Sequence, residues 1–348
     1  MQYRTLGSTG VHVSSLSLGA MMFGSWGNRD HDDAIGIIGA ALDAGVNVID
    51  TADVYSGGES ELIVGKAIAG RRDDVVLATK FSSPMGPGPN ERGASRRWIV
   101  RACEASLRRL GTEHIDLYQV HRPDLGTDLD ETLGALSDLV HSGKVRYVGS
   151  STFSPSMIVQ AQWTAERRLR ERFVCEQPPY SLLTRGVEAD VLPTCETYGM
   201  GVLVWSPLNG GWLSGRWRRD AADLSSHRTQ TMPFRPTLDH YDLAIPGNQA
   251  KLDAATELAH IADEAGLTLI QLALAFVTTH PAVSSAIIGP RTAEHLHGQL
   301  SAADIVLEPA VLDRIDSVVA PGTDLNPDDA GYNVAVLADP KRRRRAAV

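Results

Sequence analysis

The sequence lacks the features of secreted, membrane-spanning and nucleic-acid-binding proteins. Its only cysteines are Cys103, Cys175 and Cys195, which are too few for a disulfide framework and do not have the spacing of a metal site. The 33 basic residues are outnumbered by 42 acidic ones, for a formal net charge of -9, which disfavours nucleic acid and anionic lipid as partners. No apolar run approaches the roughly 20 residues that span a bilayer, and the N-terminus has no apolar secretion segment. We therefore expect a cytoplasmic protein with reduced thiols.

Short β-branched runs alternate with longer segments that have apolar residues at helical spacing. The predicted strands are residues 16–19, 46–50, 74–80, 115–121, 145–150, 173–177, 201–205 and 284–289. The predicted helices are residues 32–44, 59–69, 95–110, 128–141, 155–165, 187–198 and 249–265. Such alternation predicts a parallel sheet, and eight strands favour a (β/α)8 TIM barrel.

An open, doubly wound sheet is the structural alternative. A dinucleotide-binding sheet of that kind places the pattern G-x-G-x-x-G directly after its first strand. Neither Gly7 and Gly10 nor Gly19 and Gly24 have that spacing. The barrel is therefore the preferred prediction.

The barrel is expected to form a single domain over residues 1–320, with a short N-terminal β-hairpin. Two stretches lack a regular period. Trp212–Asn248 follows the seventh strand and is predicted to be a long loop over the barrel mouth. Residues 321–348 are predicted to be a polar C-terminal tail, and the basic run Lys341–Arg345 within it is expected to be solvated.

Polar residues stand at the ends of predicted strands, where barrel enzymes carry their chemistry. Asp50, Lys80 and His121 end three strands, and Tyr55 follows Asp50 by five positions. Lys80 is notable because nearly all the other basic residues are arginine. An ammonium buried at a strand end needs a partner, which Asp50 on the neighbouring strand can provide.

These four side chains together suggest proton transfer to a substrate oxygen. A nearby ammonium is expected to lower the pKa of the Tyr55 phenol and so to make it a usable general acid. His121 can donate a hydrogen bond to the same oxygen and orient the substrate. A proton donor aimed at an oxygen suits carbonyl reduction, for which a cofactor must supply the hydride.

At these residues the sequence resembles the aldo-keto reductase superfamily, from Arg4–Gly7 to about Ala320. Four segments carry the resemblance in order: Gly45–Tyr55, Ile115–His121, Gly143–Ser151 and Ile287–Thr292. The resemblance implies the eightfold barrel, a nicotinamide cofactor, and a catalytic tetrad of Asp50, Tyr55, Lys80 and His121. It implies NADPH-dependent, reversible reduction of aldehydes or ketones to alcohols, with Tyr55 as the proton donor and no metal.

The resemblance also implies a set of cofactor contacts along the barrel mouth. These are Ser151, Thr152, Gln177, Trp205, Ser206, Leu208, Gly210, Gly289, Arg291, His295 and Gln299. Thr152 stands where the family commonly has Asn, and Gly298 where many members have an acidic residue. Arg291 looks like the residue that meets the 2′-phosphate, which favours NADP(H) over NAD(H).

The resemblance implies a small carbonyl compound or alcohol as the substrate, and Met22, Trp26, Met85 and Trp212 are candidates for its pocket. Two other functions are compatible with these residues. Some relatives hold the cofactor as a redox sensor or as an accessory subunit of a potassium channel. A barrel lyase or isomerase could instead use Lys80 to form a Schiff base, although the segments that resemble a cofactor site disfavour this.

Overall fold

Eight parallel strands close into a barrel in the computed structural model, which describes residues 1–219, 229, 235–331, 340 and 344. In ring order they are β10 (Ser285–Ile288), β3 (Leu16–Gly19), β4 (Val48–Asp50), β5 (Val76–Phe81), β6 (Ile115–Val120), β7 (Val145–Ser151), β8 (Cys175–Gln177) and β9 (Gly201–Val204). The predicted (β/α)8 barrel is confirmed and the open sheet is excluded, because β10 pairs with both β3 and β9.

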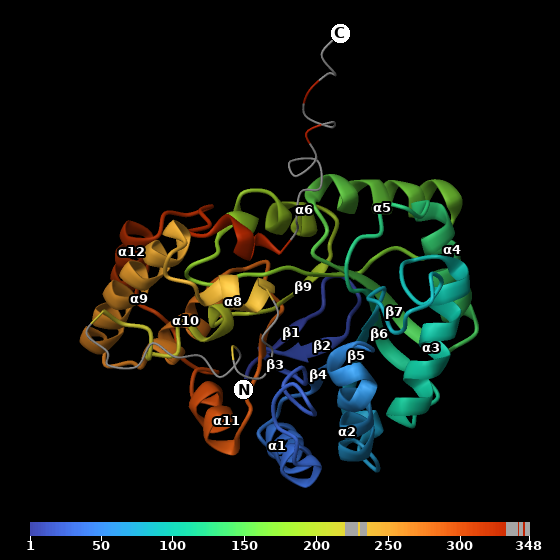
Figure 1. Ribbon diagram of the computed structural model, residues 1–348, viewed down its shortest axis with the longest axis horizontal. Coiled ribbons are helices and arrows are strands. Elements are labelled where there is room, and N and C mark those ends of the chain that lie inside the picture. The colour runs from blue at the N-terminus through green and yellow to red at the C-terminus, as the bar shows by residue number, and fades with distance from the viewer. Residues whose placement is uncertain (220–228, 230–234, 332–339, 341–343, 345–348) are drawn as a thin grey trace.

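Helices surround the strands (Figure 1). They are α1 (His31–Asp43), α2 (Glu59–Ala67), α3 (Arg96–Leu110), α4 (Leu129–His141), α5 (Pro155–Arg168), α6 (Val191–Thr197), α8 (Arg235–Tyr241), α9 (Pro246–Glu264), α10 (Leu269–Thr279), α11 (Ala293–Leu300) and α12 (Pro309–Val318). Several begin at side-chain caps: Ser95 Oγ accepts from Trp98 N at α3, and Thr268 forms a capping box with Gln271 at α10. These caps satisfy backbone donors that would otherwise lack partners.

The predicted N-terminal hairpin is also confirmed: β1 (Tyr3–Thr5) and β2 (His12–Ser14) are antiparallel. Its ribbon crosses the centre of the ring in Figure 1. Leu6 and Val13 from this hairpin belong to the apolar cluster that includes Val48, Leu117 and Leu203 of the barrel strands. The hairpin therefore covers the end of the barrel opposite the carboxyl ends of the strands.

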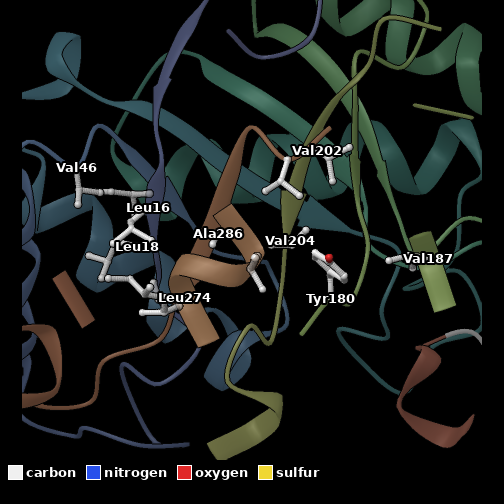
Figure 2. Close-up of a cluster of buried hydrophobic side chains, with 14 of the residues drawn as sticks. Leu16, Leu18, Val46, Tyr180, Val187, Val202, Val204, Leu274 and Ala286 are labelled. Atoms are coloured by element: carbon white, nitrogen blue, oxygen red, sulfur yellow. The ribbon is translucent and has the colours of Figure 1, made fainter. Parts of the chain in front are cut away.

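A larger apolar cluster joins the strands to the helices. Leu16 and Leu18 of β3 belong to it, as does Leu274 of α10, and Figure 2 shows these side chains close to one another. All three side chains are fully buried. Burial on this scale fixes the strands, and so holds the residues at their carboxyl ends in place.

Three regions differ from the predicted elements. The predicted helix over 187–198 is shorter, because a 3-10 turn (Gly186–Glu188) precedes α6. Helices α10, α11 and α12 were missed; in α10 the apolar residues continue around the helix and obscure a helical period. Within Trp212–Asn248, the described residues include helix α8 and the buried Trp217, whereas 220–228 and 230–234 lie outside the described residues.

No single helix among the described residues is both long and apolar enough to cross a membrane. Helices α9 and α10 pass that test only as a pair, and they are bent by 93° at the break between them.

Candidate active site

A layer of polar side chains lies at the carboxyl ends of four strands of the barrel, β4, β5, β6 and β8. Side chains alternate along a strand, so a residue two positions beyond an interior residue also points into the barrel. The interior residues Val48, Ala78, Leu117 and Cys175 are followed two positions later by Asp50, Lys80, Gln119 and Gln177. We call these four the polar layer. The same step from Leu203 and Ile287 leads to Trp205 and Gly289.

The centre of the polar layer is an ion pair between Lys80 Nζ and Asp50 Oδ1. Both side chains are buried, at 0% and 3% exposure. The other carboxylate oxygen, Asp50 Oδ2, accepts from Gln177 Nε2 at 2.8 Å and from Gln119 Nε2 at 3.4 Å. Burial is the largest single influence on Lys80 and disfavours the ammonium, but the charges and hydrogen bonds of Asp50 and Tyr55 together outweigh it, so the pKa of Lys80 is raised and the amine stays charged.

Tyr55 reaches this ion pair from the loop after β4. Lys80 Nζ lies 3.4 Å from Tyr55 Oη and also donates to the carbonyl of Thr51 at 2.9 Å. A tight turn directly after Tyr55 sets its direction, with left-handed backbone at Ser56 and Gly57 (φ 51° and 67°). The structure thus brings Asp50, Lys80 and Tyr55 together.

His121 faces the phenol from the end of β6. Its ring centroid lies 5.6 Å from that of Tyr55, with the two rings edge to face. Burial and the positive charges of Lys80 and Arg122 hold the pKa of His121 well below its usual range, so the imidazole is neutral. A neutral imidazole with one N–H can donate a hydrogen bond without carrying charge into the site.

The expected lowering of the Tyr55 pKa is not what the structure gives. Burial raises the pKa of the phenol, Lys80 opposes this, and Asp50 partly cancels Lys80, so the net direction is upward. The expectation was wrong because it counted the ammonium alone and omitted the desolvation of the phenolate. Tyr55 is therefore a protonated phenol at neutral pH, with a cation beside it that stabilises the phenolate once the proton has left.

A cavity of about 500 Å³ opens over the polar layer. Tyr55, His121 and Met22 line it at one side, together with Asp50. The predicted cofactor contacts that line it are Ser151, Gln177, Trp205, Ser206, Leu208, Gly210, Gly289, Arg291, His295 and Gln299. A methyl group added at Gly289 would meet no atom within 4 Å, so there is open room beside that backbone.

The side of the cavity away from Tyr55 is positively charged. Arg291 lines it, and so does Arg216, which the sequence analysis missed together with its neighbour Trp217. Both arginines lower the pKa of His295, with burial as the larger cause. Within the described part of the chain, neither arginine has a carboxylate partner among the ion pairs. Gln299 Oε1, in the same wall, is buried without a hydrogen-bond partner in the described residues.

These features suit a dinucleotide with phosphate groups. Two arginines of this kind can bind a phosphate group. An amide oxygen that has no donor can accept a hydrogen bond from an amino group. The loop between Ser206 and Gly211 approaches the cavity with left-handed backbone at Ser206, Asn209 and Gly210 (φ 55°, 46° and 66°), which brings main-chain groups close. The residues present therefore fit a nicotinamide dinucleotide.

Besides Lys80, which lies beneath Tyr55, four predicted residues lie away from the cavity surface. Thr152 is buried beneath it and accepts from Arg122 Nη1 at 2.6 Å. Trp26 does not line the cavity, although its ring centroid lies 6.0 Å from that of Tyr55. Met85 packs against the main apolar cluster instead. Trp212 is fully buried and packs against Trp217 (ring centroids 4.3 Å apart), so its predicted place in a substrate pocket was wrong.

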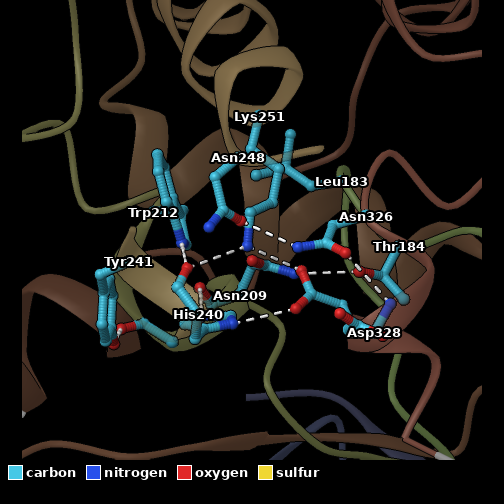
Figure 3. A network of polar contacts seen from close by, with 12 residues as sticks. Leu183, Thr184, Asn209, Trp212, His240, Tyr241, Asn248, Lys251, Asn326 and Asp328 are labelled. Atoms are coloured by element: carbon cyan, nitrogen blue, oxygen red, sulfur yellow. Dashed lines mark hydrogen bonds and ion pairs between the residues drawn. The ribbon is translucent and has the colours of Figure 1, made fainter. Parts of the chain in front are cut away.

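Trp212 serves a network that joins the loop after β9 to the C-terminal segment (Figure 3). Asp329 accepts from Lys251 Nζ at 2.9 Å and pairs with His240 at the same distance. Trp212 Nε1 donates to the carbonyl of His240 at 3.2 Å. Residues 321–331, expected to belong to a polar tail, therefore lie against the barrel, whereas most of the basic run Lys341–Arg345 lies outside the described residues.

Asp53 is another buried carboxyl group, and its backbone N–H donates to the carbonyl of Lys80. Its burial predicts an effect of pH on stability. Neither oxygen of Asp53 has a hydrogen-bond partner in the described residues, because the nearby Arg109 is paired with Glu61. Burial and the charge of Glu61 raise the pKa of Asp53 to about 8. Between about pH 4 and pH 8 the folded state therefore binds more protons than the unfolded state, and stability falls as pH rises through this window.

The difference in free energy of unfolding between Asp53→Asn and the wild type is accordingly expected to shift in favour of the variant when the pH is raised from 5.5 to 8.5. Urea denaturation at the two pH values measures this. Asp313→Asn, at an exposed position of α12, is the matched control and should change stability little at either pH. An Asp53→Asn difference that is equal at both pH values would contradict the assignment.

Comparison with known proteins places this geometry in a family. The model of the aldo/keto reductase family matches residues 15–320. A probable voltage-gated potassium channel subunit beta of Arabidopsis thaliana is 38% identical over 331 residues, which covers 92% of this chain and 97% of that protein. The uncharacterized oxidoreductase YrpG of Bacillus subtilis (strain 168) is 39% identical over 329 residues, 91% of this chain and 96% of that protein. Versiconal hemiacetal acetate reductase of Aspergillus parasiticus is 32% identical over 350 residues, which covers 92% of this chain and 98% of that protein.

The chain belongs to the aldo/keto reductase family, and oxidoreduction is the class of chemistry that this membership supports.

Proposed function

We propose that this protein reduces aldehydes or ketones to alcohols with NADPH, and that Tyr55 donates the proton. The observation that carries the proposal is the contact of a protonated phenol with a buried, charged lysine at the wall of a cavity. The named reductase from Aspergillus parasiticus and the oxidoreductase from Bacillus subtilis support the same class of reaction.

Each of the four residues has a separate task in this scheme. The Tyr55 hydroxyl donates its proton to the carbonyl oxygen of the substrate. Lys80, 3.4 Å away, stabilises the phenolate that remains, and Asp50 keeps Lys80 charged. The neutral His121 donates a hydrogen bond to the same oxygen and fixes its direction. A bound nicotinamide cofactor supplies the hydride, which no side chain can provide.

The cofactor is proposed to lie along the cavity from Ser151 and Gln177 to the two arginines. In that placement the ring of Trp205 packs on the nicotinamide, and Arg216 and Arg291 meet phosphate groups. The lysine Schiff-base alternative has no support from this arrangement, because Lys80 has 0% exposure and does not line the cavity.

Fluorescence titration with NADPH and NADH tests the cofactor assignment. The wild type is expected to bind NADPH more tightly, and Arg291→Gln to weaken NADPH binding by about tenfold, as expected for loss of a charge-assisted hydrogen bond. Binding of NADH should change much less. Arg167→Gln, an exposed arginine on α5, is the control. Equal affinities of the wild type for both cofactors would contradict the preference for NADPH.

A second candidate function is that of a cofactor-binding sensor or accessory subunit with little turnover. The relatives named as potassium channel beta subunits favour it. The two functions differ in rate: a sensor is expected to retain the cofactor tightly and to oxidise it at most slowly in a single turnover. Steady-state oxidation of NADPH with a panel of aldehydes would support the reductase, and its absence despite tight binding would support the sensor.

A further inference from the structure

Arg122 is a cation in the cavity wall that has no direct part in the proposed proton and hydride transfers. It directly follows His121 and lines the same cavity as Tyr55. Its backbone is held by Ser82, whose hydroxyl accepts from Arg122 N and donates to Arg122 O, at 3.1 Å in each case. Its guanidinium carbon lies 5.5 Å from the ring centroid of Trp205. The side chain is therefore placed in the wall, although it remains solvent-exposed.

The charge of Arg122 has no carboxylate partner within ion-pair distance in the part of the chain that the structure describes. Its two hydrogen bonds both start from Nη1 and end on neutral oxygens: the carbonyl of His121 at 2.9 Å and the hydroxyl of Thr152 at 2.6 Å. Nη2 and Nε, which form one edge of the guanidinium fork, therefore have no acceptor among the described residues.

Nearby acidic groups are already engaged elsewhere. The carboxylate of Asp50 is paired with Lys80. Glu176 is fully buried, accepts from Ser150 and from Phe153 N, and has a pKa raised to about 7 by burial. Neither side chain can turn to Arg122 without abandoning those partners.

Arg122 is also remote from the positive patch assigned to the cofactor. It follows β6, whereas Arg291 follows β10, and these two strands lie on opposite sides of the eight-membered ring. Two cations on opposite sides of one cavity can meet two different anions. The aromatic ring of Trp205 lies beside Arg122, and the apolar Met22 lines the same cavity.

We infer that Arg122 binds a carboxylate of the carbonyl substrate, so that the preferred substrates are aldehydes with an apolar or aromatic body and an anionic end. This rests on the proposed function for the place of the carbonyl group at Tyr55. The free edge of the guanidinium matches a carboxylate with two parallel N–H donors, a geometry that lysine cannot reproduce.

Two aromatic aldehydes of similar shape, one with a charged para group and one with a neutral para group, test this inference. 4-Carboxybenzaldehyde and methyl 4-formylbenzoate have the same aromatic aldehyde, but only the first is an anion at neutral pH. The wild type is expected to have a kcat/KM about tenfold higher for the carboxylate, as expected for a charge-assisted hydrogen bond, and this advantage should shrink at high salt. Arg122→Gln should remove this advantage mainly by raising the KM for the carboxylate. It should change the kcat/KM for the ester by no more than about twofold. Arg122→Lys should restore only part of it.

Arg167→Gln is the matched control, because Arg167 also stacks on a tryptophan, Trp163 at 5.0 Å, but lies outside the cavity. It should leave both aldehydes unaffected. NADPH titration of Arg122→Gln should give the wild-type dissociation constant. Weakened NADPH binding would assign Arg122 to the cofactor and overturn the inference, as would an equal loss with both aldehydes.

Calorimetric binding of 4-carboxybenzaldehyde to the NADP+-loaded protein separates this inference from the proposed function, because it requires no turnover. About tenfold weaker binding by Arg122→Gln would support the carboxylate site, even if neither aldehyde is reduced. The absence of reduction would reject only the proposed reductase activity. Equal binding by the wild type and the variant would overturn the carboxylate site while leaving reduction of neutral aldehydes intact.

Discussion

Tyr55→Phe is expected to lower kcat for carbonyl reduction by about 10² to 10⁴, the usual contribution of a positioned general acid. NADPH binding should be unchanged, because the substitution keeps the ring between Trp26 and His121 and removes only the hydroxyl group near Lys80. Stopped-flow oxidation of NADPH with a reactive aromatic aldehyde, alongside a fluorescence titration, measures both quantities.

Tyr118→Phe provides the control for that experiment. Tyr118 is fully buried and packs against Phe81, and its hydroxyl has no hydrogen-bond partner in the described residues. Loss of this hydroxyl should leave kcat unchanged. If Tyr55→Phe turned over as fast as the control, the proton donor would have to be another group.

The raised pKa of Tyr55 also shapes the expected pH profile of the wild type. A phenol with a pKa above its usual 10 remains protonated through neutral pH. Titration of Tyr55 should therefore cause no change in the rate of reduction between about pH 6 and pH 9.

Lys80→Met is expected to abolish detectable reduction and to lower the free energy of unfolding by about 3–5 kcal/mol. The variant leaves the charge of Asp50 buried without its cation, which is the costly way to break a buried ion pair. Gln177 still donates to Asp50 and limits the loss. Urea denaturation gives the free energy, and the aldehyde assay gives the rate.

The double variant Asp50→Asn/Lys80→Met separates the two effects. Removing both charges should recover much of the lost stability, because no uncompensated ion remains in the barrel. It should not recover activity, since no cation remains beside Tyr55. A Lys80→Met single variant as stable as the wild type would contradict a charged, buried lysine at this position.

The strands and most helices could be predicted because their signals are local. Alternation of short β-branched runs with capped helical segments was sufficient for the barrel, and Asp50, Lys80 and His121 followed from their places at strand ends. Gln119 was missed although the same alternation places it beside Lys80; a two-residue step from Leu117 would have found it.

The remaining features depend on contacts distant in sequence. Arg216 and Trp217 lie in a segment without a period, and only the folded chain brings them to the cavity wall. Trp212 was misplaced because its partners, Tyr241 and Lys251, come from later elements. The direction of the Tyr55 pKa depends on burial, which single residues at strand ends do not reveal.

The most direct test of the proposed reduction follows the hydrogen atom delivered to carbon. NADPH carrying deuterium in both positions at C4 of the nicotinamide is incubated with the protein and an aromatic aldehyde, and the alcohol is analysed by mass spectrometry. We predict one deuterium on the former carbonyl carbon and sustained turnover by the wild type, but not by Tyr55→Phe. Tight binding of NADPH with no labelled alcohol would contradict the reductase and leave the cofactor-binding sensor as the better explanation.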